Sequence, residues 1–246
     1  MLQQTLILAA GKGTRMGALT ERRPKPLLPV GGTPILQHVL QGLASVGIRR
    51  AVVVIGHLAE QIESYFGGGA CVGLDITYCR QEEQTGTARA ALLAREHLAS
   101  APFVMSFGDI LCARSNYRKL AAAFKAKPCD ALLGLNPVDD PWEGAAVYRD
   151  DDRVTKVVEK PPRGTSSTRW NNAGVMVLTQ AVWPVLEQLG PSPRGEYELP
   201  VGIGRMIELG FDVRGVEFDG FWSDVGRPEE LDRINRMAEE GALDLS

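Results

Sequence analysis

Short apolar runs alternate with amphipathic helical patterns along the first half of the chain. Four runs rich in Val, Ile and Leu predict buried strands over residues 5–10, 51–55, 74–78 and 103–107. Apolar positions at helical spacing between these runs predict helices over 33–46, 59–66 and 87–98, and Thr33 is the expected cap of the first. This alternation is typical of βαβ units, so we expect an α/β fold with a doubly wound, mostly parallel mixed sheet.

The second half of the chain is less regular. Its strand candidates are residues 131–135, 145–148, 154–158, 174–178 and 213–218, and its helix candidates are residues 182–189, 199–209 and 229–239. Segments 136–144 and 160–171 are rich in Pro, Gly, Ser, Asp and Thr, so we expect loops there. Long loops on such a scaffold often carry binding residues.

Composition and charge exclude several classes of protein. The 27 basic and 30 acidic residues give a net charge of −3 without a strongly basic stretch, so we expect no nucleic-acid partner. The four cysteines lack zinc-type spacing, which favours reduced thiols in the cytosol. No apolar run is long enough to span a bilayer, and the first residues lack a signal-peptide pattern. We therefore expect a cytoplasmic protein without a membrane partner.

A glycine-rich loop follows the first predicted strand. Gly11 and Gly13 would let the backbone approach a phosphate and direct its N–H groups toward it. The dinucleotide-binding pattern G-x-G-x-x-G fails because the third glycine, Gly17, comes one residue late, and no acidic residue ends the second strand at Ile55. The P-loop pattern fails as well, because no glycine lies five positions before Gly11-Lys12.

The next segment, residues 21–34, contains four prolines. Such a segment cannot be a regular helix or a central strand, so we expect a stiff, ordered loop. Lys25 lies between two of these prolines, and a restricted backbone would hold its ammonium group in place. Together with Arg15, this lysine is a candidate phosphate contact.

Six motifs resemble, in order, those of the sugar-phosphate nucleotidyltransferases, which include the glucose-1-phosphate thymidylyltransferases and uridylyltransferases. The first runs from Leu8 to Met16 and continues through Pro24-Lys25-Pro26 to Pro34. The five others are Gln81 to Ala88, Phe107-Gly108-Asp109, Glu159-Lys160-Pro161, Asn172-Ala173-Gly174 and Trp222 to Gly226. Together they cover roughly residues 5 to 235.

The resemblance implies an in-line attack of a sugar 1-phosphate on the α-phosphorus of a nucleoside triphosphate, with pyrophosphate as the leaving group. Arg15 would bind that pyrophosphate, Lys25 would lie near the reacting phosphates, and Asp109 and Asp224 would hold Mg²⁺. Asp109 alone could also be read as a turn or helix cap. No serine or cysteine nucleophile is required.

The resemblance also divides the remaining candidate residues between the two substrates. The implied nucleotide contacts are Leu8, Ala10, Gly11, Gly13, Thr14, Gln81, Gly86, Thr87 and Gly108. The amide of Gln81 can donate and accept together, which suits uracil or thymine. The implied sugar-phosphate contacts are Glu159, Lys160, Asn172 and Glu196. After Glu198-Leu199 the chain continues with Pro200-Val201 instead of the Thr-Asp frequent in the family, so the sugar pocket differs locally.

The function we expect is therefore synthesis of an NDP-sugar and pyrophosphate from a sugar 1-phosphate and an NTP, with UTP or dTTP favoured. A cytidylyltransferase acting on phosphocholine or another small phosphate is the alternative on the same fold. A non-catalytic sensor would usually lack charged site residues, none of which is missing here.

We expect one domain over residues 1–246. Within it, a nucleotide-binding lobe would cover about 1–110, a sugar-phosphate-binding lobe about 111–226, and a C-terminal helix 227–246. The sequence contains no hexapeptide repeat, so we expect no β-helix tail. Family members often form homo-oligomers, and this chain is expected to be able to do so.

Overall fold

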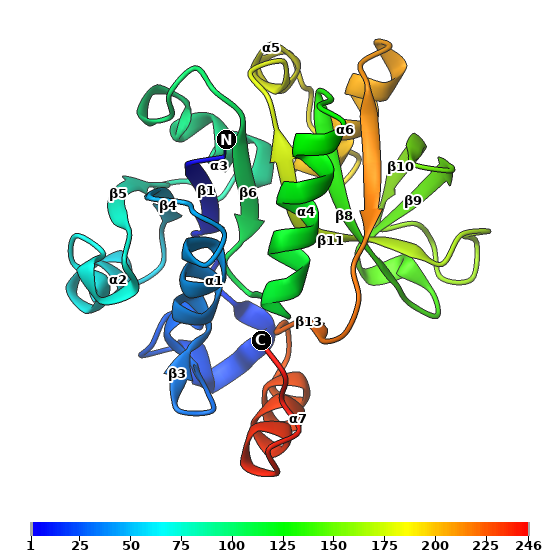
Figure 1. Cartoon of the computed structure of the whole chain (residues 1–246). Coiled ribbons are helices and arrows are strands. Elements are labelled where there is room, and N and C mark those ends of the chain that lie inside the picture. The colour runs from blue at the N-terminus through cyan, green and yellow to red at the C-terminus, as the bar shows by residue number, and fades with distance from the viewer. Residues whose placement is uncertain (1, 246) are drawn as a thin grey trace.

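The centre of the protein is a nine-stranded mixed sheet with strand order β5-β4-β1-β6-β11-β8-β12-β10-β9 (Figure 1). This computed structural model describes residues 2–245. The strands are β1 (Gln4–Ala9), β4 (Arg50–Ile55), β5 (Asp75–Arg80), β6 (Phe103–Phe107), β8 (Ala131–Pro137), β9 (Ala145–Asp150), β10 (Arg153–Glu159), β11 (Trp170–Leu178) and β12 (Val213–Glu217). Two short pairs lie outside this sheet, β2 (Pro29–Val30) with β3 (Thr33–Pro34) and β7 (Ile110–Cys112) with β13 (Trp222–Asp224).

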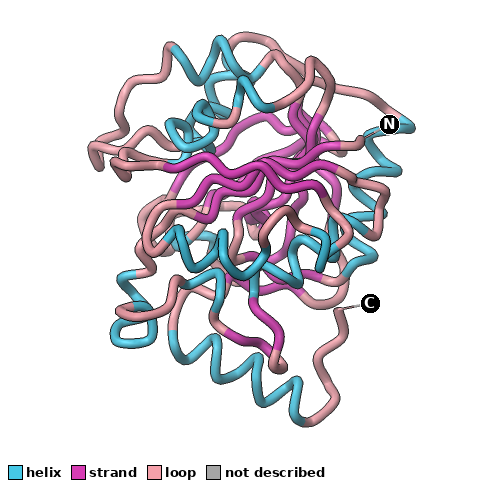
Figure 2. The backbone as a smooth tube through the Cα atoms, turned by 90° about the vertical axis from the view of Figure 1, so that its left-hand side faces the viewer, coloured by secondary structure: helices cyan, strands magenta, loops and turns pink. Residues whose placement is uncertain are grey.

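Helices cover both faces of the sheet, as Figure 2 shows. One buried cluster joins the sheet to α3 (Thr87–Leu93), α5 (Val182–Glu187) and α6 (Leu199–Glu208). A second cluster joins the opposite face to α1 (Ile35–Ala44), α2 (Ala59–Phe66) and α4 (Arg114–Ala126). Neighbouring residues of β1 alternate between the two clusters, with Leu6 in the first and Ile7 in the second. The α/β fold with a doubly wound sheet is therefore confirmed.

The parallel part of the sheet is formed mainly by the first half of the chain. Strand β1 lies between β4 and β6 and is parallel to both, and β5 extends this arrangement. Parallel strands bring their carboxyl ends to one edge, where ligands of open α/β sheets bind. The glycine-rich loop after β1 and the Gly-Asp turn after β6 therefore meet at this edge.

The second half of the sheet is more antiparallel than the sequence pattern predicts. Strand β11 runs antiparallel to β6 and β8, and β10 runs antiparallel to β9 and β12. The turn between β9 and β10 is too short for a crossover helix, which parallel neighbours require. Only β12, which follows α6, pairs in parallel with β8 among the described strands of this half.

Two sequence predictions of helices need correction, and one helix was not predicted. Helix α1 begins at Ile35 instead of being capped by Thr33, because the backbone of Thr33 pairs with Val30 in a hairpin. Helix α3 ends at Leu93, and a separate 3₁₀ turn (Arg95–His97) follows it. Helix α4 is not among the predicted elements, and its buried positions include the polar Asn116.

Helix α7 (Pro228–Glu239) packs against the proline-rich loop and forms a third, small buried cluster with it. The cluster contains Met16, Leu28, Val30, Ile35, Leu111, Val225, Leu231 and Ile234. The side chain of Asn235 accepts a hydrogen bond from Gly31 N at 2.9 Å and donates one to Pro29 O at 3.1 Å. The loop is therefore held in place by α7 as well as by its prolines.

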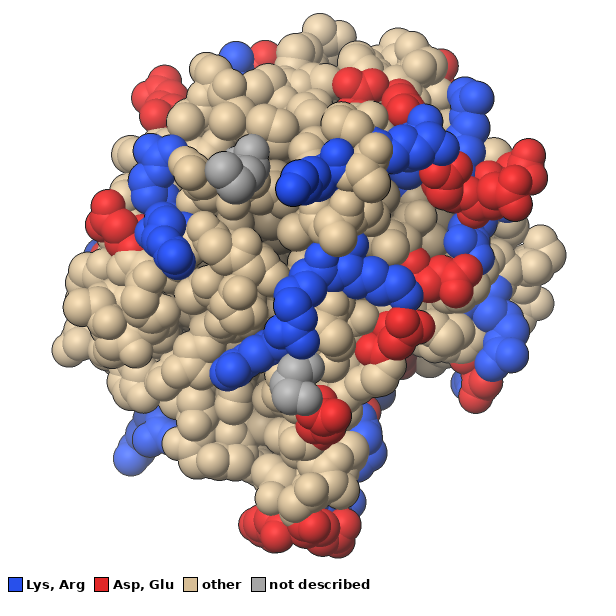
Figure 3. Space-filling view, viewed as in Figure 1, with Lys and Arg blue, Asp and Glu red and all other residues tan. Residues whose placement is uncertain are grey.

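The surface carries charges of both signs, and Figure 3 shows Lys and Arg interspersed with Asp and Glu on one face. Within residues 2–245, none of the helices combines the length and the apolar composition needed to cross a bilayer.

Candidate active site

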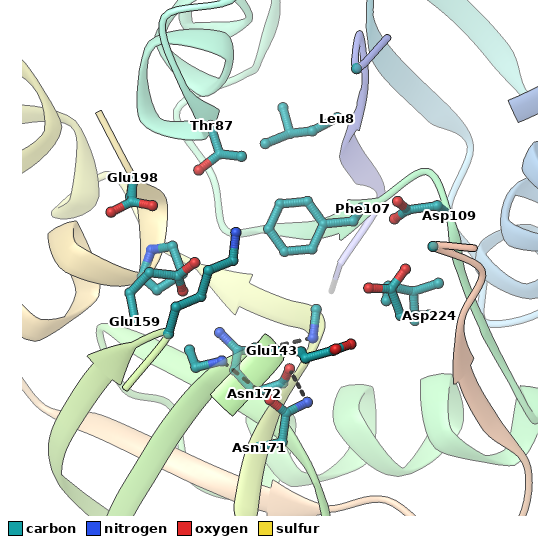
Figure 4. Close-up of a pocket in the computed structure, with 18 of the residues that line it drawn as sticks. Leu8, Thr87, Phe107, Asp109, Glu143, Glu159, Asn171, Asn172, Glu198 and Asp224 are labelled. Carbon is teal, nitrogen blue, oxygen red and sulfur yellow. Dashed lines mark hydrogen bonds between the residues drawn. The ribbon is translucent and has the colours of Figure 1, made fainter. Parts of the chain in front are cut away.

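A cavity of about 830 Å³ opens at the carboxyl ends of β1 and β6 and extends toward β10 and β11. Residues from both halves of the chain line it, from Leu8 on β1 to Arg233 on α7. Figure 4 shows Asp109 and Asp224 on one side of Phe107, and Glu159 and Glu198 on the other. The cavity therefore has two ends, one on each side of Phe107, and each end contains carboxylates.

At the first end, Lys25 lies between two carboxylates. Its Nζ is 2.5 Å from Asp109 Oδ2 and 3.9 Å from Asp224 Oδ1, and the lysine is only 8% exposed. Pro24 is extended and Lys25 opens a short 3₁₀ turn, so the prolines direct this side chain inward. The two carboxylates compensate the hydration that the ammonium group loses on burial.

The two aspartates meet although they are far apart in the sequence. Asp109 lies in the turn between β6 and β7, and Asp224 is the last residue of β13. Strands β7 and β13 pair antiparallel, with Asp224 opposite Ile110, and Val225 N donates to Asp109 O at 3.1 Å. The pairing of two three-residue strands, which no sequence spacing indicates, thus creates this end of the cavity.

The electrostatics of Asp224 favour a bound cation. Burial and the nearby Asp109 carboxylate raise the pKa of Asp224 to about 6, although Lys25 and Arg15 oppose this shift. Its Oδ1 atom is buried and has no hydrogen-bond partner within the part of the chain that the structure describes. Two carboxylates with one unsatisfied oxygen suit a divalent metal ion that also binds phosphate oxygens, as Mg²⁺ does. No group of three or more potential metal ligands occurs among the described residues.

The glycine-rich loop packs closely against Lys25. Gly13 has a left-handed backbone (φ 65°), and a Cβ atom there would lie 3.2 Å from Cβ of Lys25. Gly108 is as tightly placed, because its Cβ would lie 2.9 Å from that of Ala9. Gly13, Thr14, Lys25 and Gly108 do not line the cavity, whereas Leu8, Ala10, Gly11 and Arg15 do.

The same cavity is also lined by Gln81, Gly86 and Thr87, which lie between β5 and the start of α3. Gln81 follows β5 directly, is 8% exposed, and donates from Nε2 to Gly86 O at 3.4 Å. Gln84, which the sequence did not single out, donates to Ala10 O at 2.9 Å and so joins this segment to the glycine-rich loop. The only feature of the sequence that could have pointed to Gln84 is its position between Gln81 and Gly86.

At the second end of the cavity, strands β10 and β11 and the segments beside them present Glu159, Lys160, Asn172 and, from a loop, Glu196. Burial raises the pKa of Glu159, and the charges of Lys160 and Arg194 oppose the shift. Asn172 Oδ1 accepts from Gly174 N, whereas its buried Nδ2 has no protein partner within residues 2–245. This amide is therefore a free donor for a ligand hydroxyl.

The sequence did not single out several polar residues that line this second end. Arg194 forms an ion pair with the buried Glu198 and lies 3.5 Å from Glu159. Glu198 belongs to the same Gly-Glu-Tyr-Glu segment as Glu196, so that segment was a usable signal. Nearer the first end, Glu143, whose charge also raises the pKa of Asp224, pairs with Arg227 at 2.8 Å, a contact between distant loops that no local pattern could indicate.

The sequence is similar to those of known proteins over most of its length. The model of the nucleotidyl transferase family matches residues 4–241. The bifunctional protein GlmU of Methanococcus maripaludis is 34% identical over 227 residues, which cover 92% of this chain and 52% of GlmU. AglF of Haloferax volcanii, a UTP–glucose-1-phosphate uridylyltransferase, is 33% identical over 242 residues, or 96% of this chain and 97% of AglF.

Solved structures share the fold over its whole extent. A crystal structure named for a putative glucose-1-phosphate thymidylyltransferase of Bacillus anthracis superimposes with a TM-score of 0.88 at 26% identity, covering 97% of this chain and 96% of that one. The chain thus spans about half the length of GlmU and nearly all of AglF. The family match over almost every residue, with the six motifs gathered around one cavity, leads to one conclusion: the chain belongs to the nucleotidyl transferase family.

Proposed function

We propose that this protein joins a nucleoside triphosphate, UTP or dTTP, to a sugar 1-phosphate and releases pyrophosphate. The observation that carries the proposal is the cavity itself: Asp109 and Asp224, which pair with the buried Lys25, line one end, and the polar side chains of Glu159, Lys160 and Asn172 line the other. The names of AglF and of the Bacillus anthracis structure support the same substrates. The reaction would take place in the cytoplasm.

The two ends of the cavity match the two substrates. The nucleotide-binding lobe, about residues 1–110, would hold the base beside Gln81 and the phosphates beside Gly11 and Arg15. The sugar-phosphate-binding lobe, about residues 111–226, would hold the sugar through Glu159 and Asn172. The α7 segment, within 227–246, would keep the proline-rich loop in position.

Catalysis would rest on charge and position. A phosphate oxygen of the sugar 1-phosphate attacks the α-phosphorus, and the bond to the leaving pyrophosphate breaks in line with the attack. Lys25 would stabilise the negative charge on the reacting phosphates, Arg15 would bind the pyrophosphate, and Lys160 would orient the sugar phosphate. Asp109 and Asp224 would hold Mg²⁺, which neutralises phosphate charge.

A substrate panel tests this proposal. The purified protein would be incubated with Mg²⁺, each of UTP, dTTP, CTP and GTP, and a set of sugar 1-phosphates together with phosphocholine, and pyrophosphate release would be measured. We expect release with UTP or dTTP and at least one sugar 1-phosphate. Release only with CTP and phosphocholine would favour the cytidylyltransferase alternative. No release from any pair would refute both.

A further inference from the structure

The two substrate ends of the cavity are joined by a direct backbone pairing. Segment 85–88, which contributes Gly86 and Thr87 to the nucleotide end, lies against segment 196–199, which contributes Glu196 and Glu198 to the other end. The first belongs to the start of α3 and the second to the start of α6, more than a hundred residues later. The segments that line the two ends are therefore in direct contact with each other.

Three hydrogen bonds make this pairing. Tyr197 N donates to Thr85 O at 2.9 Å, and Ala88 N donates to Tyr197 O at 2.8 Å. Leu199 N donates to the hydroxyl of Thr87 at 2.8 Å. Tyr197 thus exchanges hydrogen bonds on both sides of Gly86, as a residue of a strand pair would.

The contact is too close for any side chain at Gly86. Its φ of +118° favours glycine, and a Cβ atom there would lie 2.4 Å from Tyr197 O. Neither segment can move toward the other, and separation would leave the backbone groups of Tyr197 unpaired. The two segments are expected to move as one unit.

A side-chain contact outside the cavity reinforces the pairing. The guanidinium carbon of Arg89 lies 4.3 Å from the centroid of the Tyr197 ring, within the range of a cation–π interaction. Neither residue lines the cavity, so neither is expected to touch a substrate. Tyr197 nevertheless lies between two residues that do, Glu196 and Glu198.

We propose that Arg89 and Tyr197 are positioning residues that couple nucleotide binding to sugar 1-phosphate binding. This inference rests on the proposed function. A nucleotide that orders segment 85–88 also orders segment 196–199, so the sugar 1-phosphate meets acceptor side chains already in place. Thermodynamic linkage requires the reverse effect to be equal: each ligand tightens the binding of the other by the same factor.

Calorimetry with a non-reacting nucleotide tests the coupling. The affinity of the full chain for α,β-methylene-UTP would be measured with Mg²⁺, with and without saturating glucose 1-phosphate. We expect glucose 1-phosphate to tighten nucleotide binding about fivefold or more in the wild-type protein. Arg89→Ala and Tyr197→Ala should each reduce this factor about two- to fivefold, as the loss of an exposed cation–π contact would. In both variants, the affinity for the nucleotide alone, without glucose 1-phosphate, should change by less than about twofold.

Two further variants separate coupling from a general loss of structure. Tyr197→Phe keeps the aromatic ring and should keep the wild-type coupling factor. Arg149→Ala removes a cation–π contact outside this cavity, in which Arg149 lies 4.4 Å from the centroid of the Trp170 ring, together with an ion pair to Glu217. It should also leave the coupling factor unchanged.

The inference is overturned if glucose 1-phosphate does not change nucleotide affinity in the wild-type protein, or if Arg89→Ala and Tyr197→Ala keep the full coupling. It is also overturned if these variants weaken nucleotide binding alone as much as they weaken the coupling. A failed substrate panel with intact, coupled binding would instead contradict the proposed function, so the two failures are distinguishable.

Discussion

Lys25 is the residue on which the proposed chemistry depends most directly. Its ammonium group is buried, lies 2.5 Å from Asp109, and forms ion pairs with both aspartates of the cavity. Lys25→Ala should lower turnover about 10²- to 10³-fold, because preorganised charge at a reacting phosphate contributes on this scale. Initial rates of pyrophosphate release at saturating substrates measure the effect.

The matched control for Lys25 is Lys119, which forms a similarly short ion pair with Asp219 on the surface, away from the cavity. Lys119→Ala should leave turnover within about twofold of wild type, because exposed ion pairs contribute little. Equal rates in the Lys25 and Lys119 variants would contradict the role assigned to Lys25.

Asp224 should make stability depend on pH in the metal-free protein. Its pKa is raised to about 6 in the folded state, whereas an unfolded aspartate has a pKa of about 3.9. Between these values the folded state binds more protons, so the free energy of unfolding falls as the pH rises through this window. The Asp224→Asn variant lacks this titrating group. Its free energy of unfolding should therefore increase relative to that of the wild type as the pH rises from about 4 to about 7.

Urea unfolding in EDTA at several pH values measures the difference between wild type and Asp224→Asn. A difference that stays constant across this pH range would show that Asp224 has an ordinary pKa in the folded protein. With metal present, the wild type should recover stability above about pH 6, because the ionised carboxylate is the form that binds a cation.

Among the elements, α7 stabilises the proline-rich loop through its buried face. Ile234 is fully buried in the third cluster, beside residues of that loop. Ile234→Ala should lower the free energy of unfolding by about 2–5 kcal/mol, because it removes buried methyl groups and leaves a cavity. Urea denaturation followed by circular dichroism measures this change.

An exposed position on the same helix provides the control for Ile234. Asp232→Ala replaces an exposed residue of α7 with a better helix former, so stability should change by no more than about 0.5 kcal/mol. A similar loss in both variants would mean that the loss in Ile234→Ala does not come from the buried cluster.

At the scale of the whole molecule, distant segments meet at the edge of the cavity: an ion pair links the loop before β9 to the start of α7. Arg227 lies 2.8 Å from Glu143, both line the cavity, and both side chains are about half exposed. Its contribution to stability should be small. Arg227→Met should nevertheless raise the KM for the sugar 1-phosphate several-fold, because an unpaired Glu143 carboxylate would repel anionic substrates.

The double variant with Arg227→Met and Glu143→Gln tests this explanation. The second substitution replaces the carboxylate with a neutral amide of similar shape, so the double variant should regain most of the wild-type KM. Steady-state kinetics with varied sugar 1-phosphate measure both effects. If the double variant is as impaired as Arg227→Met, Arg227 acts through its own contacts and not through Glu143.

Much of the first half of the fold could be predicted from the sequence. Strands of four to six apolar residues and helices with one apolar face carry a periodic signal, and β1, β4, β6 and α2 lie where this signal indicates. Helix α4 was not predicted, and one of its buried residues is the polar Asn116; β7 and β13 were not predicted because strands of three residues carry no period.

The sequence by itself determined the class of fold, the family resemblance and a set of candidate residues, because local spacing and short motifs are properties of neighbouring residues. Only the tertiary structure decided which of them meet. The pairing of β7 with β13 brings Asp224 to Asp109, and the contact of Tyr197 with segment 85–88 joins the two substrate ends. Such contacts depend on packing between segments more than a hundred residues apart, which no local pattern encodes.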